Sequence, residues 1–504
     1  QNPGASGNTV LGNLIGVDGE GQAAIPNGGN GIFIHLGSAG NVIGGPAQAE
    51  RNVISGNGKN GLMLESPGTS GNQVLGNIIG ADLTGSRAIP NALAGVKLHG
   101  GASGNIIGAA AAPNEISGNR GEGVLLKGGE FGVTGNRIAG NRIGSDAAGE
   151  KPLPNNAGIV LDDAAENVIG GAGEGNRIAF NRTVGLKLSP DCTGNVVQGN
   201  TIAGQGGLAA EVALGNPLVD NHFSANRENL IQVTGGTIVL RDETWTPQGD
   251  LNTYRIVRDD ITVAAGQTWT LAPGVNVLFD FGRGAAVGGA LVAEGEAGKP
   301  VRFTSAGRFA APLPGDWKGF SFSTGSTGSL RHASIEFAGT GITQDGGSLG
   351  VISSTIAASR EDGILLRGGS LTLVGNSLAG NGRLAINNLT GEAVAAGGTW
   401  WGSASGPRTD ANPSGAGDAV SAGVDVEGWR TDPGPKDAWL TAPVLAPGVH
   451  HFTISGERDA QWFRIPAATR NAAITATLSA LPQDYDAFLF GGLEQAGSGS
   501  LGDA

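Results

Sequence analysis

The chain has one cysteine, Cys192, in 504 residues. A single thiol excludes an intrachain disulfide framework and a zinc site built from cysteines. Aromatic residues make up 5% and charged residues 15% of the sequence, which is little for a compact globular enzyme of this length. The sequence has no run of about 18 apolar residues, the minimum for a transmembrane helix, and no signal peptide opens it. We therefore expect a fold that is stable without disulfides and does not insert into a membrane.

Basic residues are also scarce. The 31 Lys and Arg stand against 44 Asp and Glu, and the net charge is −13. An acidic surface repels nucleic-acid backbones and anionic membranes, so we expect neither as a partner. Glycine is abundant, with 92 residues, but it lacks the every-third-residue period of collagen. Since 39% of the residues are hydrophobic, the chain can bury a thin, repetitive core.

A 64-residue unit occurs three times. Its first part reads Gly-Asn-x-Ile-Gly-x-Asp, with Leu, Ile or Arg at x before Ile, and lies at 12–18, 76–82 and 140–146. Each copy continues to a Pro-Asn pair that recurs at the same interval, at 26–27, 90–91 and 154–155. A fixed period of this length indicates a solenoid of stacked repeats.

The unit contains a shorter motif, Gly-apolar-x-apolar, that predicts a strand in every rung. It lies at 31–34, 61–64, 95–98, 123–126, 158–161 and 185–188, so that shorter and longer spacings alternate. Two further strands per rung are expected, such as 41–44 and 52–55. Alternation sends Ile, Val and Leu inward, and Gly and Asn suit the corners because they accept left-handed backbone angles. We predict a right-handed parallel β-helix, with recurrent Asn forming amide ladders along the stack.

The pattern changes along the chain and predicts four segments. Residues 1–234 form the β-helix with the 64-residue double rung, although 205–235 fit no rung and indicate an interruption or junction. Residues 235–402 form a second β-helix segment with 22-residue rungs, from strands at 319–322, 341–344 and 363–366. Residues 403–437, rich in Pro, Gly, Ser and Asp, are a closing segment or linker. Residues 438–504 alternate over longer strands, at 449–454, 461–465, 473–478 and 485–490, as in a small antiparallel β-sandwich-like domain.

Several of these segments resemble known bacterial modules. The 64-residue unit resembles the repeats of large extracellular right-handed β-helix proteins, which share the pectate-lyase-like solenoid. Residues 269–275, 290–295, 301–305 and 316–320 look like a recurring module of the same exported proteins, and 399–407 resembles the ending that closes such helices. Residues 462–465 and 481–489 are similar to the pre-peptidase C-terminal domain, here truncated. The resemblance implies an extracellular or cell-surface location, with both termini cut from a longer precursor, but no single activity.

One outward column of the first β-helix is polar. It contains the residues that follow the Gly-apolar-x-apolar motif: His35, Glu65, His99, Lys127, Asp162 and Ser189. As a binding groove it would use His35, Glu65 and His99. A calcium-assisted lyase needs carboxylates and a base, and the nearest approach is Asp162 with Lys127 and Lys187. We favour the alternative, an exposed face on which neighbouring charges alternate because stacked like charges repel.

Two other groups are candidates for binding. The loop residues Asp18, Asp82 and Asp146 recur every second rung, too far apart to share one ion, and each either holds its own calcium ion or caps its turn. We favour the cap. Trp400 and Trp401 either stack on a sugar or plug the end of the helix, and we favour the plug. Calcium is the only cofactor for which the sequence offers candidates.

Repetition without a catalytic constellation favours a non-catalytic structural or adhesive protein of a bacterial surface, fibre or matrix. Edge rungs offer strands for self-association or for other surface proteins. The alternative is a polysaccharide-active enzyme (lyase, hydrolase or epimerase) or a carbohydrate-binding protein, and it rests on the polar column.

Overall fold

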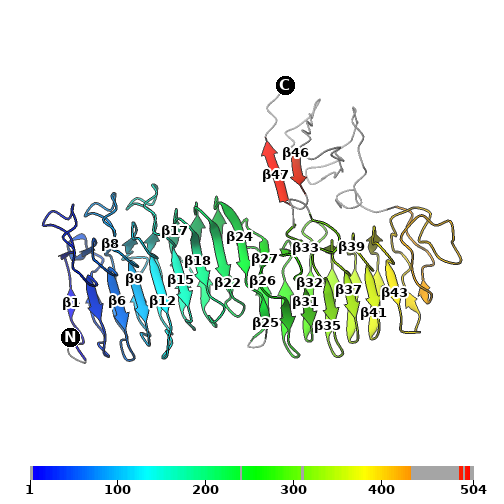
Figure 1. Ribbon diagram of the computed structural model, residues 1–504, viewed down its shortest axis with the longest axis horizontal. Helices are drawn as coiled ribbons and strands as arrows, with labels where there is room; N and C mark the ends of the chain where they lie inside the picture. The colour runs from blue at the N-terminus through cyan, green and yellow to red at the C-terminus, as the bar shows by residue number, and fades with distance from the viewer. Residues whose placement is uncertain (1–3, 239–240, 308–311, 433–486, 492–493, 500–504) are drawn as a thin grey trace, which may run out of the picture. The chain divides into compact units, whose positions relative to one another are not determined.

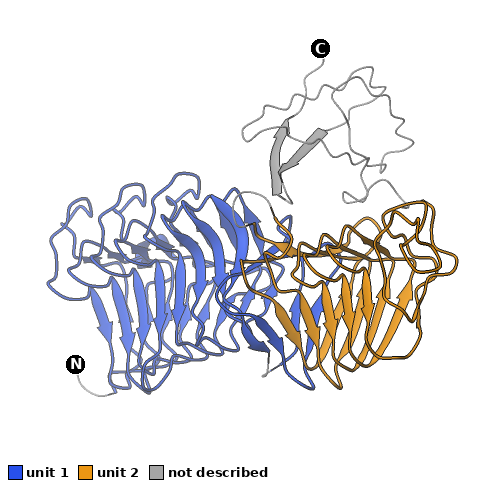
Figure 2. Cartoon of the chain, turned by 45° about the vertical axis from the view of Figure 1, so that its right-hand side comes forward, with its two compact units in different colours: residues 1–277 blue, residues 278–504 orange. Residues whose placement is uncertain are grey.

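The computed structural model describes residues 4–238, 241–307, 312–432, 487–491 and 494–499. These residues form short strands and one three-residue 3-10 helix, Gln48–Glu50. The chain divides into two compact units, residues 1–277 and 278–504 (Figure 2). From β1 to β43 consecutive strands belong to different sheets, and most of them pair in parallel with the strand three positions later in the chain (Figure 1). The described strands therefore form a parallel β-helix with three sheets.

Three sheets build most of unit 1, up to the end of β24 at residue 233. The first sheet consists of β1 (Thr9–Val10), β4 (Val42–Ile43), β7 (Gln73–Val74), β10 (Ile106–Ile107), β13 (Arg137–Ile138), β16 (Val168–Gly170), β19 (Val196–Gln198) and β22 (Leu218–Val219). The second consists of β2 (Leu14–Ile15), β5 (Val53–Ile54), β8 (Ile78–Ile79), β11 (Glu115–Ile116), β14 (Arg142–Ile143), β17 (Arg177–Ala179), β20 (Thr201–Ala203) and β23 (His222–Ser224). The third contains β3 (Ile32–Ile34), β6 (Leu62–Glu65), β9 (Val96–His99), β12 (Val124–Lys127), β15 (Ile159–Asp162), β18 (Val184–Leu188), β21 (Leu208–Val212), β24 (Glu228–Val233) and β27 (Thr253–Ile256).

The strand register of the third sheet confirms the predicted alternation of rung lengths. Ile32 pairs with Leu62, and Leu62 pairs with Val96, so a shorter rung is followed by a longer one. Side chains alternate across each strand, so one column points into the helix. Inward residues such as Ile54 and Leu64 are fully buried. Each buried aliphatic side chain of this size contributes about 1.5–3 kcal/mol relative to an exposed one.

Asparagine amides connect the rungs at all three corners, as predicted. In each ladder Nδ2 of one Asn donates to Oδ1 of the Asn in the next rung, at 2.8–3.1 Å. The first ladder joins Asn8, Asn41, Asn72, Asn105, Asn136, Asn167, Asn195 and Asn216. The second joins Asn13, Asn52, Asn77, Asn114, Asn141, Asn176, Asn200 and Asn221. The third joins Asn27, Asn57, Asn91, Asn119, Asn155 and Asn181 and continues to Gln205.

Of the two alternatives predicted for 205–235, the interruption is wrong because the third sheet continues through it, whereas two sheets do end there, as at a junction. Strands β21, β22 and β23 form a rung there, and β21 pairs with both β18 and β24. The sequence hides this rung because Gln205 takes an Asn position and a bulge separates Leu208 from Ala210. The first two sheets end at β22 and β23, and β25 (Gly236–Ile238) and β26 (Glu243–Trp245) then pair with β28 (Ile261–Val263) and β29 (Thr268–Leu271).

Unit 2 repeats with a shorter rung. Its sheets contain β31 (Ala285–Val287), β34 (Phe320–Phe322), β37 (Ile342–Gln344), β40 (Ile364–Leu366) and β43 (Ile386–Asn388); β32 (Ala290–Glu294), β35 (Thr327–Arg331), β38 (Ser348–Ile352) and β41 (Ser370–Val374); and β33 (Val301–Ser305), β36 (Ala333–Glu336), β39 (Thr355–Ala357) and β42 (Ser377–Ala379). Phe320 pairs with Ile342, and Ile342 with Ile364, so the predicted 22-residue period is confirmed. Aromatic rings fill part of the core: Phe279 stacks on Trp317 at 4.4 Å between ring centroids.

The described part of the closing segment packs against the last rungs of unit 2. Strand β44 (Val394–Ala395) pairs with β45 (Val424–Asp425). The Asp418 carboxylate accepts hydrogen bonds from the backbone N–H groups of Gly380 and Asn381, at 2.9 and 2.8 Å. Burial raises the pKa of Asp418, and these hydrogen bonds oppose the shift. The segment therefore closes the stack of rungs in this unit.

Most of the predicted domain at 438–504 lies outside the described residues, including the strands expected at 449–454, 461–465 and 473–478. Two strands there are described, β46 (Ala487–Gly491) and β47 (Glu494–Gly499), which pair antiparallel. The β-sandwich-like domain stays a prediction. Within the described ranges no helix is long and apolar enough to span a membrane.

Candidate functional site

The polar column of the third sheet is a set of ion pairs between neighbouring rungs. Glu65 and His99 are register partners, and their Oε1 and Nδ1 atoms lie 2.9 Å apart. Lys127 and Asp162 are also partners, with Nζ and Oδ2 3.1 Å apart and both side chains about half exposed. The next residue, Asp163, turns away and accepts a hydrogen bond from the backbone N–H of Gly129. The column therefore joins rungs through alternating charges.

The structure separates Lys187 from the other two lyase candidates. Its Nζ lies 2.8 Å from Oε2 of Glu211, its register partner in β21. Arg258 contacts the other oxygen of the same carboxylate, Oε1, at 3.1 Å. Lys187 is thereby part of a three-residue charge cluster with Glu211 at its centre. The predicted grouping of Asp162 with both lysines is reduced to one pair, Asp162 and Lys127.

The remaining binding candidates are aromatic. The imidazole of His35 stacks on the ring of Phe33 two residues earlier, with centroids 4.2 Å apart. Trp400 is 9% exposed and Trp401 is fully buried. An indole that stacks on a sugar must present one face to solvent, and these two rings are instead packed inside unit 2. Their placement corresponds to the plug rather than to a sugar platform.

The three recurrent loop aspartates cap their own turns. Asp18 Oδ1 accepts the backbone N–H of Gln22 at 2.7 Å, and Asp146 Oδ1 accepts that of Glu150 at 2.8 Å. Asp82 Oδ1 accepts from the N–H of Ser86 at 3.0 Å and from the Thr84 hydroxyl at 2.9 Å. Within the described residues no three His, Cys, Asp or Glu side chains are grouped to hold a metal ion.

These hydrogen bonds lower the pKa of all three carboxyl groups. For Asp18 the largest cause is the backbone N–H of Gln22, and for Asp146 it is that of Lys151. Burial alone would raise the pKa of Asp82, but the N–H of Ser86 and its other hydrogen bonds outweigh burial. The carboxylates therefore stabilise their turns in the ionised form.

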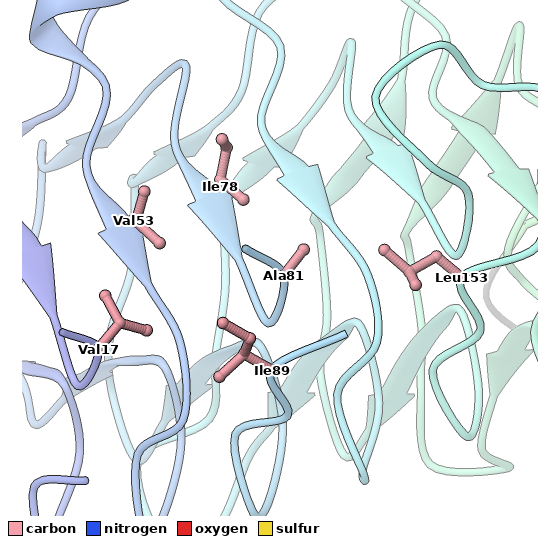
Figure 3. Packing of buried hydrophobic residues seen from close by; sticks show 6 residues of the cluster. All are labelled: Val17, Val53, Ile78, Ala81, Ile89 and Leu153. Carbon is pink, nitrogen blue, oxygen red and sulfur yellow. The ribbon is translucent and has the colours of Figure 1, made fainter. Parts of the chain in front are cut away.

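The loops that carry these aspartates stack on one another over the second sheet. We call residues 17–26, 81–90 and 145–154 the long-rung loops. The N–H of Leu83 donates to the Gly21 carbonyl at 3.0 Å, and the N–H of Ala147 donates to the Gly85 carbonyl at 3.1 Å. Beneath them lies a buried apolar cluster that combines residues of the loops with β5 and β8 (Figure 3): Val17, Val53, Ile78, Ala81, Ile89 and Leu153. The loops are thus anchored by a small core outside the helix.

A buried charge cluster under the second loop was missed by the sequence analysis. Glu115 in β11 is 5% exposed. Its Oε1 lies 2.7 Å from Arg51 NH2 and 4.0 Å from Arg142 NH1. A Cβ on Gly85 would lie 2.5 Å from Glu115 Oε2, so this loop position needs glycine. The cluster joins β11 to Arg51, just before β5, and to Arg142 in β14. Glu115 and Arg142 are register partners in the outward column of the second sheet. Their opposite charges at equivalent rung positions are the sequence pattern that could have predicted this ion pair.

A second missed residue is Glu243, which ends the first asparagine ladder. Its Oε1 accepts the backbone N–H of Gly215, next to the last Asn of that ladder. Burial raises the pKa of Glu243, and this hydrogen bond opposes the shift. A small cavity beside it is lined mainly by apolar side chains, among them Val212, Leu218, Val233, Trp245 and Tyr254. The cavity is too small and apolar for a substrate, so Glu243 is a structural acid.

Comparison with known families agrees with this architecture. A family model described as a right handed beta helix region matches residues 80–242. The chain is a right-handed β-helix repeat protein. The match begins in the second long rung and ends after the first two sheets have finished. No curated protein and no solved structure matches this β-helix protein.

Proposed function

We propose that this β-helix protein is a non-catalytic structural or adhesive solenoid of a bacterial surface, fibre or matrix. The observation that carries the proposal is the use of polar side chains as connectors between rungs. Three amide ladders run along unit 1, and outward charges such as Glu65 and Lys127 pair with the next rung. Amide and charged side chains that could contact a substrate in an enzyme are bonded here to the neighbouring rung.

Self-association tests the proposal. The purified chain is examined by analytical ultracentrifugation and by negative-stain electron microscopy over a range of concentrations. We expect assembly into filaments or ordered arrays, because unpaired strand edges add further strands. A strictly monomeric particle at every concentration contradicts the structural role.

A polysaccharide-active enzyme is the second candidate, and the Lys127–Asp162 pair is the observation that favours it. The two side chains lie 3.1 Å apart on an open face, 51% and 41% exposed. A screen of uronate-containing and neutral polysaccharides, read by reducing ends and by the absorbance of unsaturated products, tests for activity. Activity that is lost in Asp162→Ala and kept in Asp163→Ala supports an enzyme. Activity unchanged in Asp162→Ala excludes this pair as its site.

A further inference from the structure

The last rung of unit 2 is covered by the chain that follows it. We call residues 402–432 the strap. The N–H of Ala385, just before β43, donates to the Ala419 carbonyl at 2.8 Å. The N–H of Ser421 donates to the Ile386 carbonyl at 3.0 Å. Strand β45 in the strap likewise pairs with β44. The strap therefore occupies the backbone groups through which a further rung would pair.

Asp418 in the strap takes the place of an asparagine in a corner ladder. The backbone N–H and Nδ2 of Asn381 both donate to its Oδ2, at 2.8 and 3.0 Å. In unit 1 Asn119 makes the same two bonds to Oδ1 of Asn155, at 3.0 and 2.9 Å. Asn155 then donates from Nδ2 to the following rung, whereas the second oxygen of Asp418 accepts the N–H of Gly380 at 2.9 Å. A carboxylate has no N–H to donate, so the ladder ends at Asp418.

The rest of the strap is irregular. Between β44 and β45 the described chain forms no strand, and Arg408 and Asp410 in this stretch are exposed. Beyond Asp418 a side chain fastens the strap again, because Ser421 Oγ accepts the N–H of Asn388 at 2.7 Å. An exposed, irregular segment opens at a lower free energy than the paired strands beneath it, so the strap can detach while the rungs stay folded.

The edge beneath the strap carries no charged residue. Residues 384–391, which include β43, contain no Asp, Glu, Lys or Arg, and neither does β44. Two copies of the chain can therefore meet at this edge with less of the repulsion that a net charge of −13 produces. Each edge presents both N–H and C=O groups, so two identical edges are complementary when they pair antiparallel across a two-fold axis. A second copy is thus the partner that this edge fits.

We infer that the strap is an autoinhibitory contact, which keeps the β43 edge of a second copy from pairing with the same edge of this chain. When the strap detaches, the N–H of Ala385 and the carbonyl of Ile386 lose their partners, and unpaired strand edges bind other strands. Asp418 is a positioning residue in this device, because it fastens the strap at the end of the ladder. The inference rests on the self-association proposed above and names its surface, its partner and its regulation.

Sedimentation velocity on the full chain tests the strap, with tryptic cleavage after Arg408 as the measure of its release. In Asp418→Ala we expect faster cleavage and a midpoint concentration for association that falls at least roughly tenfold, because the hydrogen bonds to the carboxylate are lost. Asp410→Ala is the matched control, since it removes the same charge from an exposed position of the strap. Asn387→Cys in the Asp418→Ala chain locates the contact. Asn387 is the central residue of β43, so two copies are expected to form a reducible disulfide there.

Faster cleavage with wild-type association overturns the inference, and so does cleavage that stays at the wild-type rate, because Asp418 then does not hold the strap. Equal effects in Asp410→Ala, or no disulfide at position 387, overturn it as well. If circular dichroism shows that Asp418→Ala is unfolded, Ser421→Ala, which removes the acceptor of the Asn388 N–H, replaces it under the same criteria. Association of the wild-type chain alone decides the structural role, whereas only the difference between variant and wild type decides the role of the strap.

Discussion

Each interior asparagine of the ladders makes hydrogen bonds in both directions along the stack. Asn119 is fully buried. Its Nδ2 donates to Asn155 Oδ1 at 2.9 Å and to the Ile79 carbonyl at 3.1 Å, and its Oδ1 accepts from Asn91 Nδ2 at 2.9 Å. The fold depends on such residues because an unpaired buried polar group is costly.

We predict that Asn119→Ala lowers the free energy of unfolding by on the order of 3 kcal/mol, since it leaves polar partners above and below unsatisfied. Asn27 in the first described rung is exposed and has one ladder neighbour, Asn57. Asn27→Ala is therefore the control and is expected to cost less. Denaturant titration measures both, and equal effects would contradict the ladder as the source of stability.

The buried carboxyl group of Glu243 makes stability depend on pH. Because burial raises its folded-state pKa above the ordinary value of 4.5, the folded protein binds this proton more tightly than the unfolded chain. Its contribution is fully present below pH 4.5 and is lost as pH rises through the raised pKa. The slope is at most about 1.4 kcal/mol per pH unit.

Glu243→Gln is predicted to remove this component, because a neutral amide still accepts the Gly215 N–H. The variant gains stability relative to the wild type as pH rises above 4.5, the ordinary pKa of the group. Unfolding curves of both proteins from pH 4 to pH 8 give the difference. Curves that stay parallel over this range would show that Glu243 titrates normally.

At the scale of single residues, the sequence predicted pairs that lie in regular rungs and missed pairs at the irregular ones. Glu65 and His99 lie in one column because each follows the same motif. Glu243 and Gly215 lie where the first two sheets end. Their separation in the sequence matches no repeat period, so the hydrogen bond between them could not be predicted. Lys187 was assigned to Asp162 because Glu211 falls in the shortened rung that the sequence hides.

At the scale of elements, the long-rung loops add three stacked hairpins to an otherwise regular helix. The second loop is held on both sides by hydrogen bonds to its neighbours, and its Gly85 lies close to the Glu115 carboxylate. Its exposed basic residue, Arg87, lies five positions after the capping Asp82. This places a protease site next to the cap.

We predict that Asp82→Ala opens this loop, because Ser86 N–H and the Thr84 hydroxyl lose their acceptor. Tryptic cleavage after Arg87 then becomes faster by about tenfold, as expected for a loss of roughly 1.4 kcal/mol in local stability. Asp82→Asn keeps an acceptor oxygen and is expected to stay close to the wild-type rate. Cleavage rates that do not change in Asp82→Ala would contradict the role of the cap.

The same geometry predicts the response of the loops to calcium. Each Asp18, Asp82 and Asp146 carboxylate already accepts backbone N–H groups. We therefore expect the thermal midpoint to shift by less than about 1 °C between 5 mM calcium and excess chelator, since a site with a useful affinity would stabilise the fold by mass action. A shift of several degrees, abolished by the three Asp→Asn changes, would establish these loops as calcium sites.

Element boundaries followed from the sequence in most rungs where glycine precedes two inward apolar residues. The strand at Gly95 is an example, and β9 begins at the next residue. The rung at 208–233 could not be found this way. Its corners use Gln205 and Asn226, and its strand in the third sheet contains a bulge. Hydrophobic alternation locates strands only while the register is regular.

At the scale of the whole molecule, the net charge of −13 opposes contact between copies. Salt screens this repulsion, with a Debye length that falls from about 10 Å at 0.1 M to about 3 Å at 1 M. We predict that self-association increases with salt between 0.05 and 0.5 M. Sedimentation velocity measures the effect, and association that weakens with salt would point to contacts made by opposite charges instead.

The polarity of the ladders has a consequence for how such a chain evolves. Every rung inside the three ladders donates amide hydrogen bonds toward the next rung and accepts them from the one before. One 64-residue unit adds one long and one short rung, and both of its ends carry the same donors and acceptors as the unit beside it. Recombination that duplicates or deletes one unit therefore leaves every junction chemically unchanged. The length of the β-helix can therefore change between related proteins in steps of one unit, about 10 Å along the stack. Such a change requires no new fold.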